Sequence, residues 1–206
     1  ANFFKDKEIF ILATKRDTAT NLVDKVRVFL EEVPPFLKSG LLVDNRQSIE
    51  LENGSKIKAG ATGSNSKDAA RSEALSLLII DEAAFIKAMD TIWVAAQPTL
   101  ATGGDCIVLS SPNGIGNWFH KQYIEAEAGT TEKVGNATIS FNPIKLPWNL
   151  HPDRDAEWGR LEKRKIGEQA FAQEHDCDFL QSGNNVVSVK ALQWYEEHPT
   201  EEEPAD

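Results

Sequence analysis

The stretch that most constrains the fold is residues 75–85, where an apolar run ends abruptly in two adjacent acids. Residues 75–80 carry little polar alternation and lead directly into Asp81 and Glu82. A short run of this kind predicts a strand buried on both faces of a parallel sheet. Open α/β sheets bind ligands at the carboxyl ends of their strands. We therefore expect Asp81 and Glu82 to lie at the ligand-binding edge of such a sheet.

An apolar strand that ends in Asp-Glu resembles the Walker B motif of P-loop ATPases. The resemblance implies that Asp81 holds Mg²⁺, through water, and that Glu82 polarises the water that attacks the γ-phosphate. For this motif taken alone, a structural alternative stays open. A strand can also stop at an acidic turn or at a helix N-terminus, where acids are stabilised anyway.

Strands and helices alternate along the rest of the chain. Short apolar runs predict strands, and apolar residues at helical spacing predict helices. The alternation predicts an α/β domain with a mainly parallel sheet. The predicted strands are 9–13, 75–80, 106–111 and 137–141, and the predicted helices are 18–33, 84–100, a segment around 118–124, and one long helix over 155–175.

Residues 41–61 change period. Residues 48–52 and 55–59 alternate between apolar and polar side chains, and Asn53-Gly54 separates them. Asn-Gly between two alternating runs is a strong hairpin signal, so we expect a β-hairpin with a two-residue turn here.

Composition excludes some classes of function. The formal net charge of −10 argues against a free-standing binder of duplex DNA, which needs clustered Lys and Arg, but not against a motor that contacts DNA through a few basic residues. Cys106 and Cys177 are far apart, as suits a reducing interior better than a disulfide framework. The longest apolar runs are far shorter than the roughly 20 residues that span a bilayer.

The order of the segments resembles the ATPase domain of a tailed-phage terminase large subunit, the motor that packages viral DNA into procapsids. The resemblance covers nearly all of the chain to about residue 185. Several stretches match together, in the family's order. They are residues 11–15 and 33–37 around a helix, the hairpin 48–55, Arg71, the Walker B segment 78–85, motif III at 109–114, and the closing segment 171–179.

The resemblance implies a fold and a set of site residues. The fold is a P-loop NTPase-like α/β domain of the RecA/ASCE type, with a mainly parallel sheet, flanking helices and a β-hairpin insertion, truncated at its N-terminal part. Glu82 and Arg71 are the implied catalytic residues, with Arg71 as an arginine finger that reaches the ATP of a neighbouring subunit. Asp81 is the implied metal ligand.

Alternatives stay open for the other implied residues. Ser110, Ser111 and Asn113 are implied to sense the γ-phosphate, yet Ser and Asn also end strands in ordinary turns. Arg71 is equally compatible with a surface arginine paired with a neighbouring carboxylate.

The family's phosphate loop, G-x-x-x-x-G-K-[ST], does not occur in these residues. The resemblance places it upstream and a nuclease domain downstream. We therefore expect residues 1–185 to be a partial ATPase domain, and 186–206 to be a linker toward the nuclease domain with an acidic tail. Without the strand that enters the phosphate loop, strand 106–111 is expected to be an apolar sheet edge. We therefore expect these residues by themselves to be destabilised, to self-associate, or to fill the gap with another segment such as 137–141.

The implied cofactors are ATP and Mg²⁺, with weak or absent binding expected in these residues alone. The implied partners are duplex DNA, the portal protein, the terminase small subunit and further copies in a ring, with no membrane, in the host-cell cytoplasm. A superfamily 2 helicase-like ATPase remains the alternative enzyme. A non-catalytic fragment that only binds partners is the alternative from another class, and ATP hydrolysis would count against it.

Overall fold

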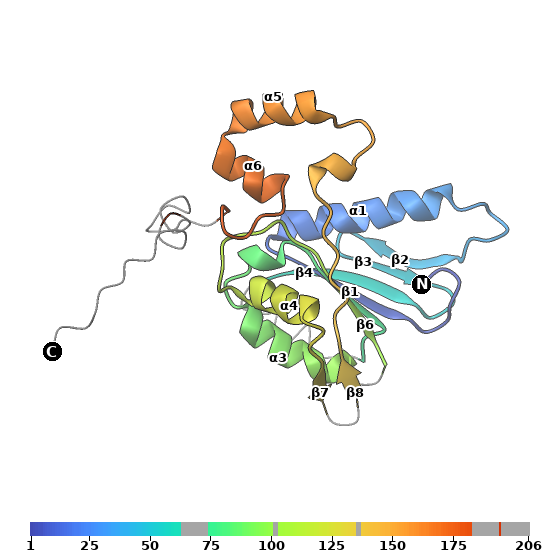
Figure 1. Cartoon of the computed structure of the whole chain (residues 1–206). Coiled ribbons are helices and arrows are strands. Elements are labelled where there is room, and N and C mark those ends of the chain that lie inside the picture. Colours follow the sequence, from blue (N-terminus) through green and yellow to red (C-terminus); the bar gives the residue numbers. More distant parts are fainter. Residues whose placement is uncertain (63–73, 101–102, 135–136, 183–193, 195–206) are drawn as a thin grey trace. The chain divides into compact units, whose positions relative to one another are not determined.

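The computed structural model describes residues 1–62, 74–100, 103–134, 137–182 and 194 (Figure 1). The chain divides into two compact units. The first comprises Ala1–Ser110 and Gln122–Asn142, and the second comprises Ser111–Lys121 and Pro143–Asp206. The candidate site described below lies in the first unit.

The first unit contains a six-stranded sheet in the order β2-β3-β4-β1-β5-β6. Four strands run parallel: β4 (Lys56–Ala61), β1 (Glu8–Ala13), β5 (Leu77–Ile80) and β6 (Asp105–Val108). Two strands, β3 (Ser48–Leu51) and β2 (Leu41–Asn45), are antiparallel. The prediction of a mainly parallel sheet is confirmed. Strand β6 lies at one end of the described sheet, as predicted for strand 106–111, but it spans Asp105–Val108 and so ends earlier than predicted.

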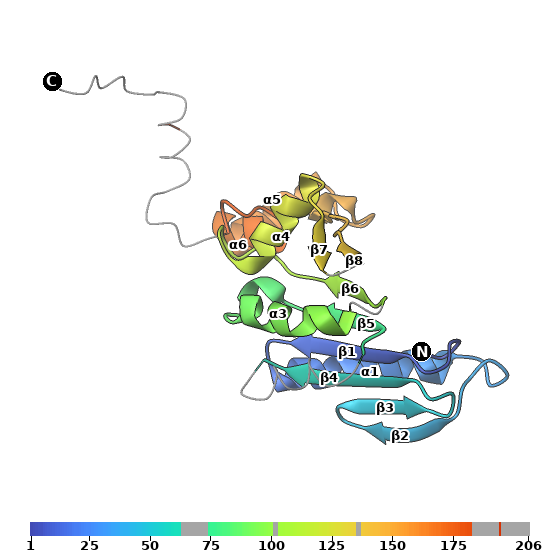
Figure 2. The same cartoon turned by 90° about the horizontal axis from the view of Figure 1, so that it is seen from below.

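Helices cover both faces of this sheet. Figures 1 and 2 show α1 (Arg16–Glu32) on one face and α3 (Met89–Leu100) on the other. Helix α1 ends before Pro34, as predicted, because proline cannot continue a helix. The predicted helix over 84–100 begins later than expected, since a 3₁₀ turn (Ala83–Phe85) comes first.

Burial of β5 differs between its two faces. Leu78 and Ile80 are at most 1% exposed, whereas Leu77 and Ile79 are only half-buried. The latter two line an apolar groove of about 300 Å³ together with residues of β1 and α1. The prediction of complete burial on both faces is therefore wrong for the face that α1 covers.

The hairpin forms where the Asn-Gly signal placed it, but its turn is longer than two residues. The Gly54 N–H donates to the Leu51 carbonyl, and the Leu51 N–H donates to the Ser55 carbonyl. Gly54 has a φ of 84°, which only glycine adopts easily. This arrangement is a three-residue loop with a bulge. Strand β2 was not predicted, because all five of its residues are exposed and no alternation marks them.

The second unit contains α5 (Ala156–Ile166) and α6 (Glu168–Glu174), preceded by a 3₁₀ turn (Trp148–Leu150). The single helix predicted over 155–175 is wrong. It breaks at Gly167, whose φ of 87° lies in the left-handed region and ends α5. Trp148, Trp158 and Phe171 pack together beside this break, with ring centroids 5.5 to 6.5 Å apart.

The remaining elements are α4 (Trp118–Glu127), whose residues fall in both units, and a separate two-stranded sheet. That sheet joins β7 (Glu132–Val134) to β8 (Ala137–Ile139). The described pairing of β8 is with β7, so the alternative in which residues 137–141 fill the gap beside β6 is wrong. Among the described residues, no helix combines the length and the apolar composition that a membrane span requires.

Candidate functional site

The two acids predicted from the sequence lie at the carboxyl end of β5. The Asp81 N–H donates to the Leu12 carbonyl of β1 (2.8 Å), which continues the parallel ladder beyond Ile80. One carboxylate oxygen of Asp81, Oδ1, accepts the Glu82 N–H at 3.0 Å. Asp81 is half-buried and Glu82 is exposed. The first acid is thus anchored in the sheet, while the second projects beyond it.

Glu82 has an unusual backbone conformation. Its φ and ψ are 54° and 40°, in the left-handed region that residues with a Cβ avoid. Among the described residues, Asp6 and Cys177 are the other non-glycine residues with a positive φ. Such conformations cost roughly 1 kcal/mol or more and tend to occur at functional sites. The strained backbone therefore makes Glu82 the residue of this turn that is the best candidate for a functional role.

The Glu82 side chain is held by a residue that the sequence did not single out. The Thr14 hydroxyl donates to Glu82 Oε2 at 2.6 Å. Thr14 directly follows β1, and β1 pairs in register with β5 so that Leu12 lies opposite Ile80. Two residues further along each strand, Thr14 and Glu82 meet. This contact could be predicted only from the register of β1 and β5, and the register requires knowing that the two strands are neighbours.

Ser110 joins the same edge from the other side of β5. It lies two residues beyond β6, and its Oγ accepts the Ala84 N–H at 3.1 Å. The Leu109 carbonyl accepts the Ala83 N–H at 3.1 Å. The turn that follows Glu82 is therefore tied to the carboxyl end of β6.

Of the other predicted residues, two belong to the second unit and one lies outside the described residues. Ser111 and Asn113 belong to the second unit, where the Asn113 carbonyl accepts the side-chain amide of Asn117 at 3.0 Å. Arg71 lies outside the described residues. Their roles, like those of Asp81 and Glu82, stay predictions.

The residues present fit a Mg²⁺ ion held largely by water and phosphate. Asp81 supplies a half-buried carboxylate with one oxygen engaged by the Glu82 N–H. Among the described residues, no group of three or more His, Cys, Asp or Glu side chains forms a cage for a metal. Mg²⁺ in nucleotide sites needs only one or two carboxylates, because substrate phosphates and water complete its octahedron.

Cys106 is a poor candidate for a nucleophile at neutral pH. Cys106 is the cysteine of β6, and burial raises its pKa to about 12. A thiol with that pKa stays protonated and is a poor nucleophile.

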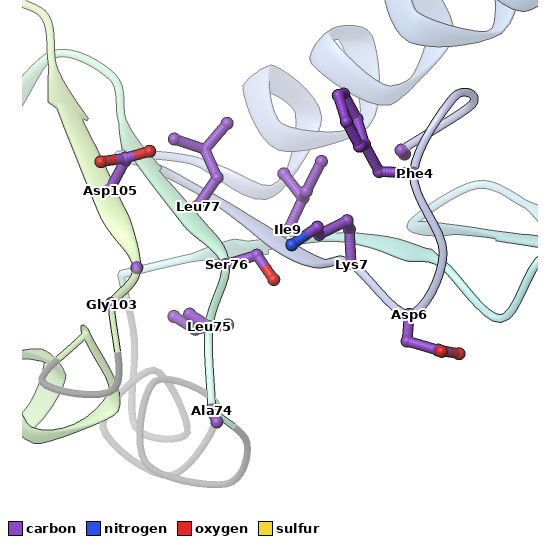
Figure 3. A pocket seen from close by; sticks show the side chains of 12 residues that line it. Phe4, Asp6, Lys7, Ile9, Ala74, Leu75, Ser76, Leu77, Gly103 and Asp105 are labelled. Atoms are coloured by element: carbon purple, nitrogen blue, oxygen red, sulfur yellow. The ribbon is translucent and has the colours of Figure 1, made fainter.

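A second hollow lies at the opposite ends of the same strands. It measures about 610 Å³ and is lined by residues that include Lys7, Ser76 and Asp105 (Figure 3). These residues precede or begin β1, β5 and β6, whereas Asp81 and Glu82 follow β5. The hollow is thus separate from the candidate site.

Comparison with known proteins identifies the family to which this chain belongs. The family model described as terminase large subunit, T4likevirus-type, N-terminal, matches residues 1–193. The terminase large subunit of Thermus phage G20c is 30% identical over an alignment of 132 residues, and the match covers 59% of this chain and 26% of that protein. The chain therefore aligns with about a quarter of that relative's length, and the large subunit of Thermus virus P23-45 gives the same figures.

Solved structures show the same fold. The large terminase ATPase domain of Thermus phage P74-26 superposes with a TM-score of 0.61 at 22% identity, covering 85% of this chain and 78% of that one. The large terminase of the thermophilic bacteriophage D6E gives a TM-score of 0.63 at 11% identity, covering 86% of this chain and 42% of that one. These neighbours bear out the predicted P-loop NTPase-like fold. Since the family model spans nearly the whole chain, the chain belongs to the T4likevirus-type terminase large subunit family, whose N-terminal region it matches.

Proposed function

We propose that the chain carries the Walker B and motif III parts of an ATP-driven motor that packages viral DNA. Family membership and the terminase ATPase fold support a role in DNA packaging. The observation that carries the finer proposal is the pair Asp81 and Glu82 at the carboxyl end of β5, with Glu82 strained and hydrogen-bonded. An ordinary acidic turn requires neither the strain nor the bond.

In this proposal the two acids have different tasks. Asp81, anchored by its backbone in the sheet, would hold Mg²⁺ through water, and the ion when bound offsets phosphate charge. Glu82, exposed beyond the strand, would orient the water that attacks the γ-phosphate. The difference in burial between the two side chains suits these tasks, since a metal ligand is held still and a water-orienting group must face the substrate.

The remaining site residues complete the proposal. Ser110, whose Oγ accepts the Ala84 N–H, would report the state of the γ-phosphate to the turn that carries Glu82. Ser111 and Asn113 would act with it, and Arg71 would reach the ATP of a neighbouring subunit. Arginine suits that task because its planar guanidinium bridges phosphate oxygens as charge develops.

Nucleotide is the proposed substrate. The D6E large terminase has been solved in complex with ADP and with ATP-gamma-S, which supports the choice. These 206 residues contain no G-x-x-x-x-G-K-[ST] sequence, so we expect them to bind ATP weakly by themselves. We propose that residues 1–185 act within one ATPase domain and that 186–206 link it to a nuclease domain.

Duplex DNA, the portal protein, the small subunit and further copies in a ring are the proposed partners, in the host-cell cytoplasm. The net charge of −10 argues against DNA binding through a broad basic surface. Contact would instead use a few local basic residues. The family match favours this proposal over a helicase of superfamily 2.

The decisive experiment replaces Glu82 in a full-length large subunit that contains this region. Glu82→Gln keeps the size of the side chain and removes its charge, so nucleotide binding should persist while turnover is lost. Glu31→Gln is the matched control, because Glu31 is an exposed acid near the far end of α1. Phosphate release and nucleotide affinity are measured for both. Wild-type turnover by Glu82→Gln would contradict the proposal.

Arg71 is tested by mixing subunits. Arg71→Ala should lower turnover by roughly 10³-fold or more if the guanidinium acts as a finger. In a mixture of Arg71→Ala and Glu82→Gln subunits, some interfaces pair an intact Glu82 with an intact Arg71. Partial recovery of turnover is then expected, and no recovery at any mixing ratio would argue against action between subunits.

A further inference from the structure

We propose that Thr14 is a positioning residue for Glu82, which it holds in the orientation that turnover requires. The proposal rests on the function proposed above for Glu82. It adds a residue that directly follows a neighbouring strand and lies in the stretch 11–15, for which the sequence predicted no role at the site.

The contact itself is short and specific. The Thr14 hydroxyl donates to Glu82 Oε2 at 2.6 Å, across 68 positions of sequence. Hydrogen bonds to a carboxylate are shorter and stronger than bonds between neutral groups. A glutamate side chain rotates about three bonds, and Glu82 is exposed, so without an anchor its carboxylate would sample several positions. With Oε2 engaged, Oε1 keeps its lone pairs available for a water molecule.

Thr14 stands just before α1, but the hydrogen bond described for its hydroxyl goes to Glu82. A threonine just before a helix often caps it by accepting a backbone N–H. Here the N-cap of α1 is Lys15, and its side chain makes no capping bond. The Thr14 hydroxyl is directed to Glu82 instead.

Thr14 is itself held in place by the next strand. The Thr62 hydroxyl donates to the Thr14 carbonyl at 3.1 Å, and the Thr62 N–H donates to the Ala13 carbonyl at 3.0 Å. Thr62 directly follows β4, which pairs with β1 over its whole length. The anchor of Glu82 is thus fixed by the ladder on one side, while the Glu82 backbone is fixed by the ladder of β5 on the other. Such support is what precise orientation of a water-activating group requires.

The test measures steady-state ATP hydrolysis by a full-length large subunit that contains this region. Thr14→Val has nearly the same shape but lacks the hydroxyl, and should lower kcat by about 10-fold with KM changed less than twofold, since orientation is lost while binding is not. Thr14→Ser keeps the hydroxyl and should retain kcat to within about threefold. Thermal melting checks that each variant folds, and Thr14→Ala replaces Thr14→Val if the latter does not.

A double-mutant cycle separates positioning from a structural effect. If Thr14 acts through Glu82, then Thr14→Val should not lower the residual turnover of Glu82→Gln any further. A further loss in that background would overturn the proposal, as would an unchanged or raised kcat in Thr14→Val alone. Undiminished turnover in Glu82→Gln is a different result, because it would remove the proposed function whatever Thr14 does.

Discussion

Gly159 lies buried in α5, and its replacement by alanine is expected to destabilise the second unit although alanine is the better helix former. A Cβ at this position would stand 2.5 Å from Trp148 Cη2 and 2.7 Å from Trp148 Cζ2. Carbon atoms in ordinary contact lie about 3.5–4.0 Å apart, so the indole ring or the helix would have to move by about 1 Å.

The indole ring is not free to move. Its Nε1 donates to Asp176 Oδ1 at 2.9 Å, and the Trp148 N–H donates to the His175 carbonyl at 2.8 Å. The rings of Trp158 and Phe171 pack against it, with centroids 5.5 and 5.9 Å away. Overpacking of this kind costs about 1–3 kcal/mol, whereas Gly→Ala within a helix contributes about 1 kcal/mol. The expected net effect is a loss of about 1 kcal/mol.

The clash can be isolated by shrinking its partner. In a Trp148→Leu background the space beside Gly159 opens, so Gly159→Ala should there stabilise by about 1 kcal/mol, as helix propensity alone predicts. Urea unfolding followed by far-UV circular dichroism measures all four proteins of the cycle. The expected coupling energy between the two positions is about 2 kcal/mol. An increase in stability for Gly159→Ala in the otherwise unchanged chain would refute this reasoning.

Three further predictions concern the first unit. Ser55 is fully buried, and its Oγ donates to the Phe4 carbonyl (2.7 Å) and accepts the Lys7 N–H (3.1 Å). Ser55→Ala should therefore lower the free energy of unfolding by about 1–3 kcal/mol. An unchanged urea midpoint would argue against this. Burial raises the pKa of Cys106 from the ordinary value of 9.0 to about 12, so above pH 9 the folded state keeps a proton that the unfolded state loses. The stability due to this thiol should therefore be complete below pH 9 and decline between pH 9 and 12. Cys106→Ala should remove that part of the decline, and equal pH profiles for the two proteins would contradict it. Ile107 is 45% exposed on β6, the end strand of the described sheet. Ile107→Lys should reduce self-association of the 206-residue chain, measured by sedimentation velocity, because a lysine on an edge strand discourages pairing with another chain. The control Val94→Lys on α3, at a residue that is 67% exposed, should not. Equal effects of the two lysines would mean that added charge, rather than edge pairing, controls association.

Local pattern was enough to predict much of the fold. The apolar run before Asp81, the alternation on either side of Asn53, and the helical spacing that ends at Pro34 each describe neighbours in sequence. Strands and helices repeat their burial every two or 3.6 residues, so their existence can be read without knowing what they pack against. The position of Asp81 and Glu82 at a strand end followed from the same reasoning.

Where the local pattern was weak, prediction failed for physical reasons. Strand β2 is wholly exposed and carries no alternation, and it is held by its pairing with β3. The break between α5 and α6 depends on the positive φ of Gly167. The sequence of an amphipathic segment does not show which φ a glycine within it adopts. The longer hairpin turn likewise depends on the backbone of Gly54.

The sequence by itself predicted the apolar strands β1 and β5 and the two acids that end β5. Only the tertiary structure decided what meets those acids. The Thr14–Glu82 bond joins positions 68 apart, and it exists because β1 lies beside β5 in one particular register. A shift of that register by one residue would turn the side chains of a strand to the other face of the sheet. Contacts between strands are set by pairing, which no periodicity within a single strand encodes.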